Sequence, residues 1–182
     1  MNDFWAEMSA CEHFVQIYEA DGAFLDALAG FVGGGLRQGD AAIIIATPPH
    51  RMELDRRLTE MGIPLGAARS QDQFISLDAQ ETLAKFMVNG WPDEDLFADL
   101  VGELLERARR NGRKVRAFGE MVALMWARGE YAATVRLEHL WHGLCEAEMF
   151  CLFCAYPKIG LTEDPSQSMA RVLAAHSKIL AA

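Results

Sequence analysis

The sequence predicts a three-layer, doubly wound α/β fold, in which a mainly parallel sheet of about five or more strands has helices on both faces. Short apolar runs rich in β-branched and aromatic residues alternate with segments whose apolar residues recur at helical spacing. The run at 41–46 (AAIIIA) is apolar throughout, which suits a parallel strand covered on both faces. Right-handed crossovers leave few other topologies for this alternation.

Strands are expected where short runs favour extended backbone. In chain order they are 11–19, 41–46, 74–77, 114–119 and 149–156. Helices are expected where apolar residues recur every three to four positions. In chain order they are about 24–32, 51–61, 83–87, 92–108, 120–128, 130–146 and 165–181.

Glycine and proline set several of these boundaries. The glycine triplet at 33–35 is expected to end the first long helix, because glycine is common just after a helix. Pro92 is expected to open a helix, and Gly129 to divide the two helices that follow the fourth strand. The last helix is expected to start near Asp164 and to carry His176 and Ile179 on its apolar face.

Length and composition indicate one cytoplasmic domain. The 182 residues predict a single domain over 1–182, with its core at about 11–160 and a C-terminal helix at about 165–181. The longest apolar run, 149–156, is too short to span a membrane, and the N-terminus lacks a signal-peptide pattern. A net charge of −9 disfavours direct binding of nucleic acid. Four cysteines in a chain of this size are expected to be reduced thiols.

In a doubly wound sheet, ligands bind outside the carboxyl ends of the strands. Five loops are expected there: 19–23, 47–51, 78–82, 119–121 and 156–160. The first of these loops lies where a nucleotide-binding protein has its phosphate loop, but it contains Gly22 alone, no lysine and no following hydroxyl residue. Glu19 and Asp21 would also repel phosphate, so we expect no nucleotide hydrolysis and no enzyme activity.

Two cysteine and histidine patterns raise the question of a metal. Cys151 and Cys154 form a C-x-x-C motif inside a predicted strand, where residues three apart face opposite sides, so buried thiols are expected instead of a shared ion. His139, His142 and Cys145 are spaced so that one broad helix face could supply metal ligands, but no fourth ligand is fixed by sequence. We therefore predict no metal and no cofactor.

Charged residues beside buried segments leave two alternatives open. Arg116 and Glu120 flank the fourth strand; they form either a structural ion pair, or Glu120 projects into the ligand crevice. The segment Leu137–Trp141 (LEHLW) is either functional or ordinary core with Glu138 at the surface.

Six stretches resemble one known family. They are HFVQIYE at 13–19, GLRQGDAAIIIATPPH at 35–50, SLDAQETLAKFM at 76–87, RAFGEMVALMWARGE at 116–130, LEHLW at 137–141 and CAYP at 154–157. Together they resemble the MEDS domain, the methanogen/methylotroph DcmR sensory domain, over nearly the whole chain. The chain departs from the family in one place, because His142 follows Trp141 where asparagine is usual.

The resemblance implies a sensory domain with a RecA-related fold that lacks a phosphate loop. We expect it to bind a small molecule at the strand ends and to regulate a partner, a histidine kinase or a transcription regulator. The last helix is expected either to pack on the sheet, which is the favoured use, or to supply a surface for a homodimer or a partner. The alternative is a ligand-free interaction module that controls such a partner by direct contact. The residues expected to line the ligand site are His13, Tyr18, Asp21, His50, Arg116, Glu120 and Trp141.

Overall fold

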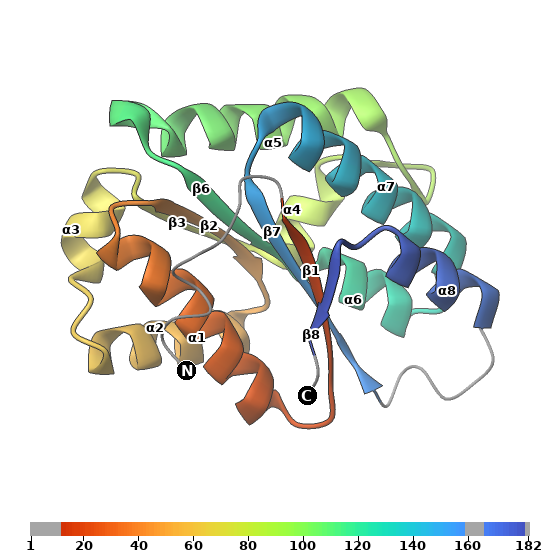
Figure 1. Cartoon of the computed structure of the whole chain (residues 1–182). Coiled ribbons are helices and arrows are strands. Elements are labelled where there is room, and N and C mark those ends of the chain that lie inside the picture. The colour runs from red at the N-terminus through yellow and green to blue at the C-terminus, as the bar shows by residue number, and fades with distance from the viewer. Residues whose placement is uncertain (1–11, 159–165, 181–182) are drawn as a thin grey trace.

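The computed structural model describes residues 12–158 and 166–180. They form a six-stranded sheet between two layers of helices, as Figure 1 shows. In spatial order the strands are β3 (Phe74–Asp78), β2 (Ala41–Ala46), β6 (Val115–Gly119), β7 (Cys151–Pro157), β1 (His13–Tyr18) and β8 (Lys178–Leu180). Every pair of neighbouring strands is parallel. The predicted doubly wound α/β fold is therefore confirmed.

The helices divide between the two faces of the sheet. One face packs against α1 (Asp21–Arg37), α2 (Pro48–Glu60) and α3 (Leu65–Ser70). The other face packs against α4 (Ala79–Ala84), α5 (Glu94–Ala108), α6 (Met121–Ala127), α7 (Tyr131–Glu148) and α8 (Ser166–Ala174). A small hairpin of β4 (Met87–Val88) and β5 (Trp91–Pro92) precedes α5, and a 3₁₀ turn, Arg110–Gly112, follows α5.

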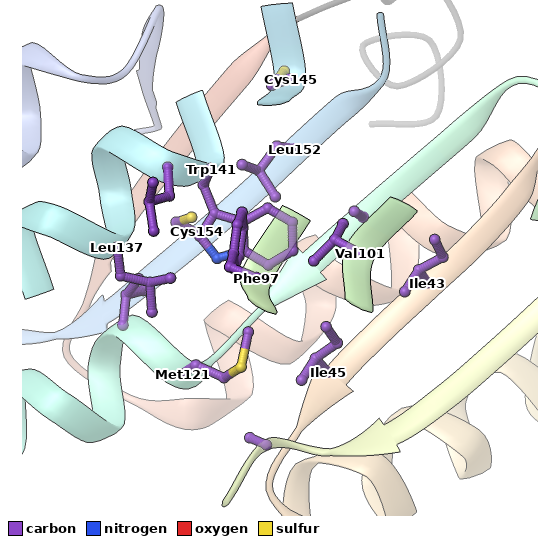
Figure 2. Packing of buried hydrophobic residues seen from close by; sticks show 14 of the residues in the cluster. Ile43, Ile45, Phe97, Val101, Met121, Leu137, Trp141, Cys145, Leu152 and Cys154 are labelled. Atoms are coloured by element: carbon purple, nitrogen blue, oxygen red, sulfur yellow. The ribbon is translucent and has the colours of Figure 1, made fainter. Parts of the chain in front are cut away.

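Strand β2 belongs to both cores, as its apolar run predicts. Ile43 and Ile45 pack with Phe97 and Val101 of α5 in one core, which Figure 2 shows, while Ile44 packs in the other. All six residues of β2 are buried. Burying a side chain of this kind contributes about 1.5–3 kcal/mol, so this central strand is a major source of stability.

The glycine triplet does not end the first helix, because α1 continues through it to Arg37. These glycines provide close packing instead of a cap. A Cβ atom at Gly33 would lie 2.6 Å from Cε of Met61, and one at Gly35 would lie 2.5 Å from Nε of Arg116. The helix needs small residues here so that neighbouring side chains can cross its surface.

The helix expected to open at Pro92 begins slightly later in the structure. Pro92 lies in β5, and α5 begins two residues later, where the side chain of Asp93 accepts a hydrogen bond of 3.0 Å from the backbone N–H of Leu96. Asp93 satisfies one of the free N–H groups at the helix start, which Pro92 cannot do. The expected helix at 83–87 is α4, which lies earlier and ends before the hairpin.

The last helix is shorter than expected, because α8 ends at Ala174 and the chain then forms a strand. β8 pairs in parallel with β1, with Ile179 opposite Val15. The edge of β1 offers unpaired backbone groups, so pairing with β8 satisfies them. The expected start of the helix near Asp164 lies outside the described residues. In the described part of the chain, no helix has the length and apolar character needed to cross a membrane.

Candidate functional site

The connections from β2 and β6 leave the sheet on opposite faces. β2 leads into α2 on one face, whereas the neighbouring β6 leads into α6 on the other. The strand ends therefore diverge at this point, which is where open α/β sheets bind their ligands. Thr47 and Glu120 are the residues that follow the two strands.

The carboxylate of Glu120 joins these two strand ends. One of its oxygens, Oε2, accepts a hydrogen bond of 2.7 Å from the backbone N–H of Thr47, and the other, Oε1, accepts one of 3.2 Å from the Thr47 hydroxyl. The backbone N–H of Glu120 donates to the carbonyl of Ile45 at 2.8 Å. Glu120 is only 6% exposed, so its negative charge is held by these donors and not by bulk water.

His50 lies between this buried carboxylate and the surface. Its Nδ1 lies 2.8 Å from Oε1 of Glu120, and its Nε2 lies 3.7 Å from Oδ2 of Asp21 at the start of α1. The hydrogen bond to Glu120 raises the pKa of His50 above its ordinary value, although burial partly opposes this rise. The Asp21 side chain is 66% exposed. The three residues thus form a chain of charged groups from a buried carboxylate to solvent.

An aromatic wall supports His50. The ring of Phe24 packs edge-on against His50, with 5.3 Å between centroids, and stacks on Tyr18 at 4.7 Å. Burial, together with the charges of Glu120 and Asp21, raises the pKa of Tyr18, so its hydroxyl stays protonated. The structure therefore brings together four of the predicted site residues: Tyr18, Asp21, His50 and Glu120.

Arg116 is not part of this group, and it does not pair with Glu120. Its Nε donates a hydrogen bond of 2.9 Å to Oδ2 of Asp40, and its Nη1 donates one of 3.0 Å to the carbonyl of Phe31. Arg116 lies near the amino end of β6, whereas Glu120 follows its carboxyl end, about 13 Å away at the usual rise of a strand. The structural pair of Arg116 with Glu120 that was considered from the sequence is therefore wrong. Arg116 instead binds groups at the amino ends of the strands.

Trp141 supports the end of β6 from the core. It is fully buried, packs edge-on against Phe97 with 4.9 Å between ring centroids, and lies so close to Gly119 that a Cβ atom there would be 3.3 Å from the indole. Figure 2 shows it among the apolar side chains between the sheet and the helices α5 and α7. Trp141 therefore fixes the backbone just before Glu120.

His13 lies in a second polar cluster, which the sequence did not predict. Nε2 of His13 lies 3.3 Å from Sγ of Cys154 and 3.6 Å from Oε2 of Glu138, and Nε2 of His176 lies 3.4 Å from the same Glu138 oxygen. The hydroxyl of Tyr156 donates a hydrogen bond to the other oxygen of Glu138. The four ligand-type atoms all lie within 4.8 Å of one another.

Burial dominates the electrostatics of this cluster. Desolvation, helped by the neighbouring His176 and His142, lowers the pKa of His13 to about 2, and desolvation raises the pKa of Glu138. Burial likewise raises the pKa of the Cys154 thiol well above its ordinary value. The group can therefore remain in the core without an ion only if most of its members are neutral.

No local motif could have revealed this cluster. Its members come from β1, α7, β7 and the turn after α8, at sequence separations that match no metal-binding spacing. Of the two alternatives left open for this segment, the one that placed Glu138 at the surface is wrong, since Glu138 is 0% exposed. Its only sequence signal is a carboxylate within an apolar helix face. The predicted opposition of Cys151 and Cys154 is confirmed, because the two belong to different cores.

His139, His142 and Cys145, which the sequence suggested as metal ligands on one helix face, do not come together. His139 is exposed, whereas Cys145 is buried and donates from Sγ to the carbonyl of Phe150. His142 lies 3.4 Å from Glu146 on the same helix. Their side chains thus point to separate environments.

Comparison with known protein families gives a match that covers nearly all of the fold. A family model described as MEDS, MEthanogen/methylotroph, DcmR Sensory domain, matches residues 12–177. None of the curated proteins matches the chain. The matched range takes in every strand from β1 to β7, both polar clusters and α8. The chain therefore belongs to the MEDS family of sensory domains, as its sequence resemblance implies.

Proposed function

We propose that this sensory domain detects a small polar molecule at the carboxyl ends of β1, β2 and β6, through His50, Asp21 and Glu120. The observation that carries the proposal is that one imidazole contacts a buried carboxylate on one side and approaches an exposed carboxylate on the other. A ligand at the exposed end can therefore influence the charge held between the strand ends.

The geometry favours a hydroxyl compound as the ligand. Nε2 of His50 and the nearest oxygen of Asp21 are 3.7 Å apart, an ion-pair distance that is longer than a direct hydrogen bond and leaves both groups able to bond to a third. A hydroxyl can accept a hydrogen bond from the imidazole N–H and donate a hydrogen bond to the carboxylate. A small alcohol or hydroxy acid fits these two requirements together.

The same residues offer a route to a partner. Thr47 and Glu120 stand at the beginnings of α2 and α6, which lie on opposite faces of the sheet. A ligand that alters the His50 to Glu120 hydrogen bond would change how these two helices are held. We propose that a histidine kinase or transcription regulator binds the domain and responds to this change. The alternative, a module that binds its partner without a ligand, differs in that its complex would survive Glu120→Gln.

We further propose that the site binds without catalysis. The segment 19–23, which runs from the end of β1 into the first turn of α1, supplies Glu19 and Asp21 but no lysine and no hydroxyl for a nucleotide and its magnesium ion. The other groups at the site are the imidazole of His50, the carboxylate of Glu120 and the hydroxyls of Thr47 and Tyr18. This composition suits reversible recognition of a polar group.

A thermal-shift screen with small alcohols and hydroxy acids tests the proposal. A compound at a hundredfold excess over its Kd should stabilise the protein by about 2.7 kcal/mol. His50→Gln should abolish the shift, whereas His139→Gln, which changes an exposed histidine on α7, should retain it. The proposal fails if no compound shifts the wild-type protein, or if His50→Gln responds as the wild type does.

A further inference from the structure

The geometry points to a second site that is independent of the first: a closed, four-ligand site for a zinc-type divalent metal ion, made by His13, Glu138, Cys154 and His176. Two imidazoles, one thiolate and one carboxylate are the ligand types that zinc takes in proteins. The site would be structural, because all four positions of a tetrahedral ion are filled by this chain.

The spacing of the ligand atoms agrees with a tetrahedral ion. Typical zinc bond lengths, about 2.0–2.1 Å to nitrogen or oxygen and about 2.3 Å to sulfur, place neighbouring ligand atoms about 3.3–3.6 Å apart. Four distances in the cluster are 3.3, 3.4, 3.6 and 3.7 Å, between the imidazole nitrogens, the Cys154 sulfur and the Glu138 oxygen. These four separations are therefore close to the edge lengths of a coordination tetrahedron.

A backbone carbonyl holds the Nδ1 side of each imidazole. Nδ1 of His13 lies 3.1 Å from the carbonyl of Ala175, and Nδ1 of His176 lies 2.7 Å from that of Val172. A carbonyl only accepts, so each Nδ1 carries the proton and each Nε2 keeps its lone pair. This outer support is typical of histidine metal ligands. Tyr156 supports the carboxylate of Glu138 in the same way.

One buried nitrogen in the cluster makes no hydrogen bond within the described residues. The His176 side chain is 0% exposed, yet its Nε2 has no hydrogen bond within the described part of the structure. A buried nitrogen in this state is costly, and a metal ion would satisfy it. The charges would balance too, because a divalent cation offsets one thiolate and one carboxylate beside two neutral imidazoles. Binding would release the thiol and carboxyl protons to solvent.

The ion would fasten the C-terminal segment to the sheet. His13 belongs to β1, Cys154 to β7 and Glu138 to α7, whereas His176 lies in the turn between α8 and β8. This turn already meets β1, since the backbone N–H and the hydroxyl of Ser177 both donate to the carbonyl of His13, at 2.8 and 3.0 Å. Metal binding would thus decide how firmly α8 and β8 are held.

Metal analysis of the full chain tests this assignment. After expression with added zinc and gel filtration, elemental analysis should find about one zinc ion per chain. Cys154→Ser should lose most of it. Cys151→Ser is the matched control, because it makes the same change on the same strand at a buried cysteine that faces the other core. Tyr156→Phe should weaken zinc binding about 10- to 100-fold in a chelator competition.

X-ray absorption on the wild-type protein gives a result that does not depend on how the variants fold. We expect one sulfur neighbour at about 2.3 Å and three nitrogen or oxygen neighbours at about 2.0–2.1 Å. The assignment is overturned if the zinc-grown protein holds no zinc, if the bound zinc has no sulfur neighbour, or if Cys154→Ser keeps as much zinc as Cys151→Ser. None of these results would affect the hydroxyl-compound response at His50, so the two proposals fail separately.

Discussion

His50 lies 2.8 Å from Glu120, and this contact ties the helix that follows β2 to the end of β6. Neither residue has a neighbour in sequence that would suggest the pairing, because 70 positions separate them. The parallel sheet brings them together, since the carboxyl ends of neighbouring strands meet at one edge.

The contribution of His50 to stability should depend on pH. Its pKa in the folded state lies above the unfolded value of about 6.5, because Glu120 and, more weakly, Asp21 favour its cationic form. The stabilisation is therefore fully present below about pH 6.5 and is lost as the pH rises through the folded-state pKa. Urea melts of the wild type and His50→Gln should differ more at about pH 6 than at about pH 9. A difference that grows with pH would contradict the ion pair.

Arg116 should be coupled to Asp40 and not to Glu120. Arg116→Met leaves the Asp40 carboxylate, whose side chain is 12% exposed, without its cation, so we expect a loss of about 3 kcal/mol or more. In double-mutant cycles the coupling of Arg116→Met with Asp40→Asn should exceed about 1 kcal/mol, and that with Glu120→Gln should stay within about 0.5 kcal/mol. Equal coupling to both carboxylates would show that the two ends of β6 are not independent.

Two glycines of α1 should respond in opposite ways to alanine. Gly35→Ala places a methyl group against Nε and Cδ of Arg116, a side chain held by its own hydrogen bonds, and should cost about 1–3 kcal/mol. Gly22→Ala meets nothing within 4 Å and should be neutral or stabilise by up to about 1 kcal/mol. Denaturant melts of the two variants compare them directly. A Gly35→Ala protein as stable as the wild type would mean that Gly35 serves no packing role.

The sheet could be predicted from sequence because its central strands are short, continuous apolar runs, as at 41–46 and 151–156. β8 could not, since three residues after an amphipathic helix carry no strand signal of their own and pair only because the edge of β1 is open. The glycine triplet misled because the same residue serves as a cap and as a point of close approach.

The two polar clusters also differ in whether the sequence could predict them. Asp21, His50 and Glu120 were found because a rule about strand ends places them without any tertiary detail. His13, Glu138, Cys154 and His176 meet in the interior, where only side-chain packing decides which groups touch. All four lay in predicted strands or helices, and Cys154 and His176 had only a structural interpretation there.

The most direct test of the sensory site is a map of backbone amide chemical shifts, recorded while the first stabilising hydroxyl compound is added to ¹⁵N-labelled protein. The proposed site predicts that the largest changes fall on Asp21, Thr47, His50 and Glu120, and that they disappear in His50→Gln. Changes centred elsewhere, with the amides of Thr47, His50 and Glu120 unmoved at saturation, would contradict it.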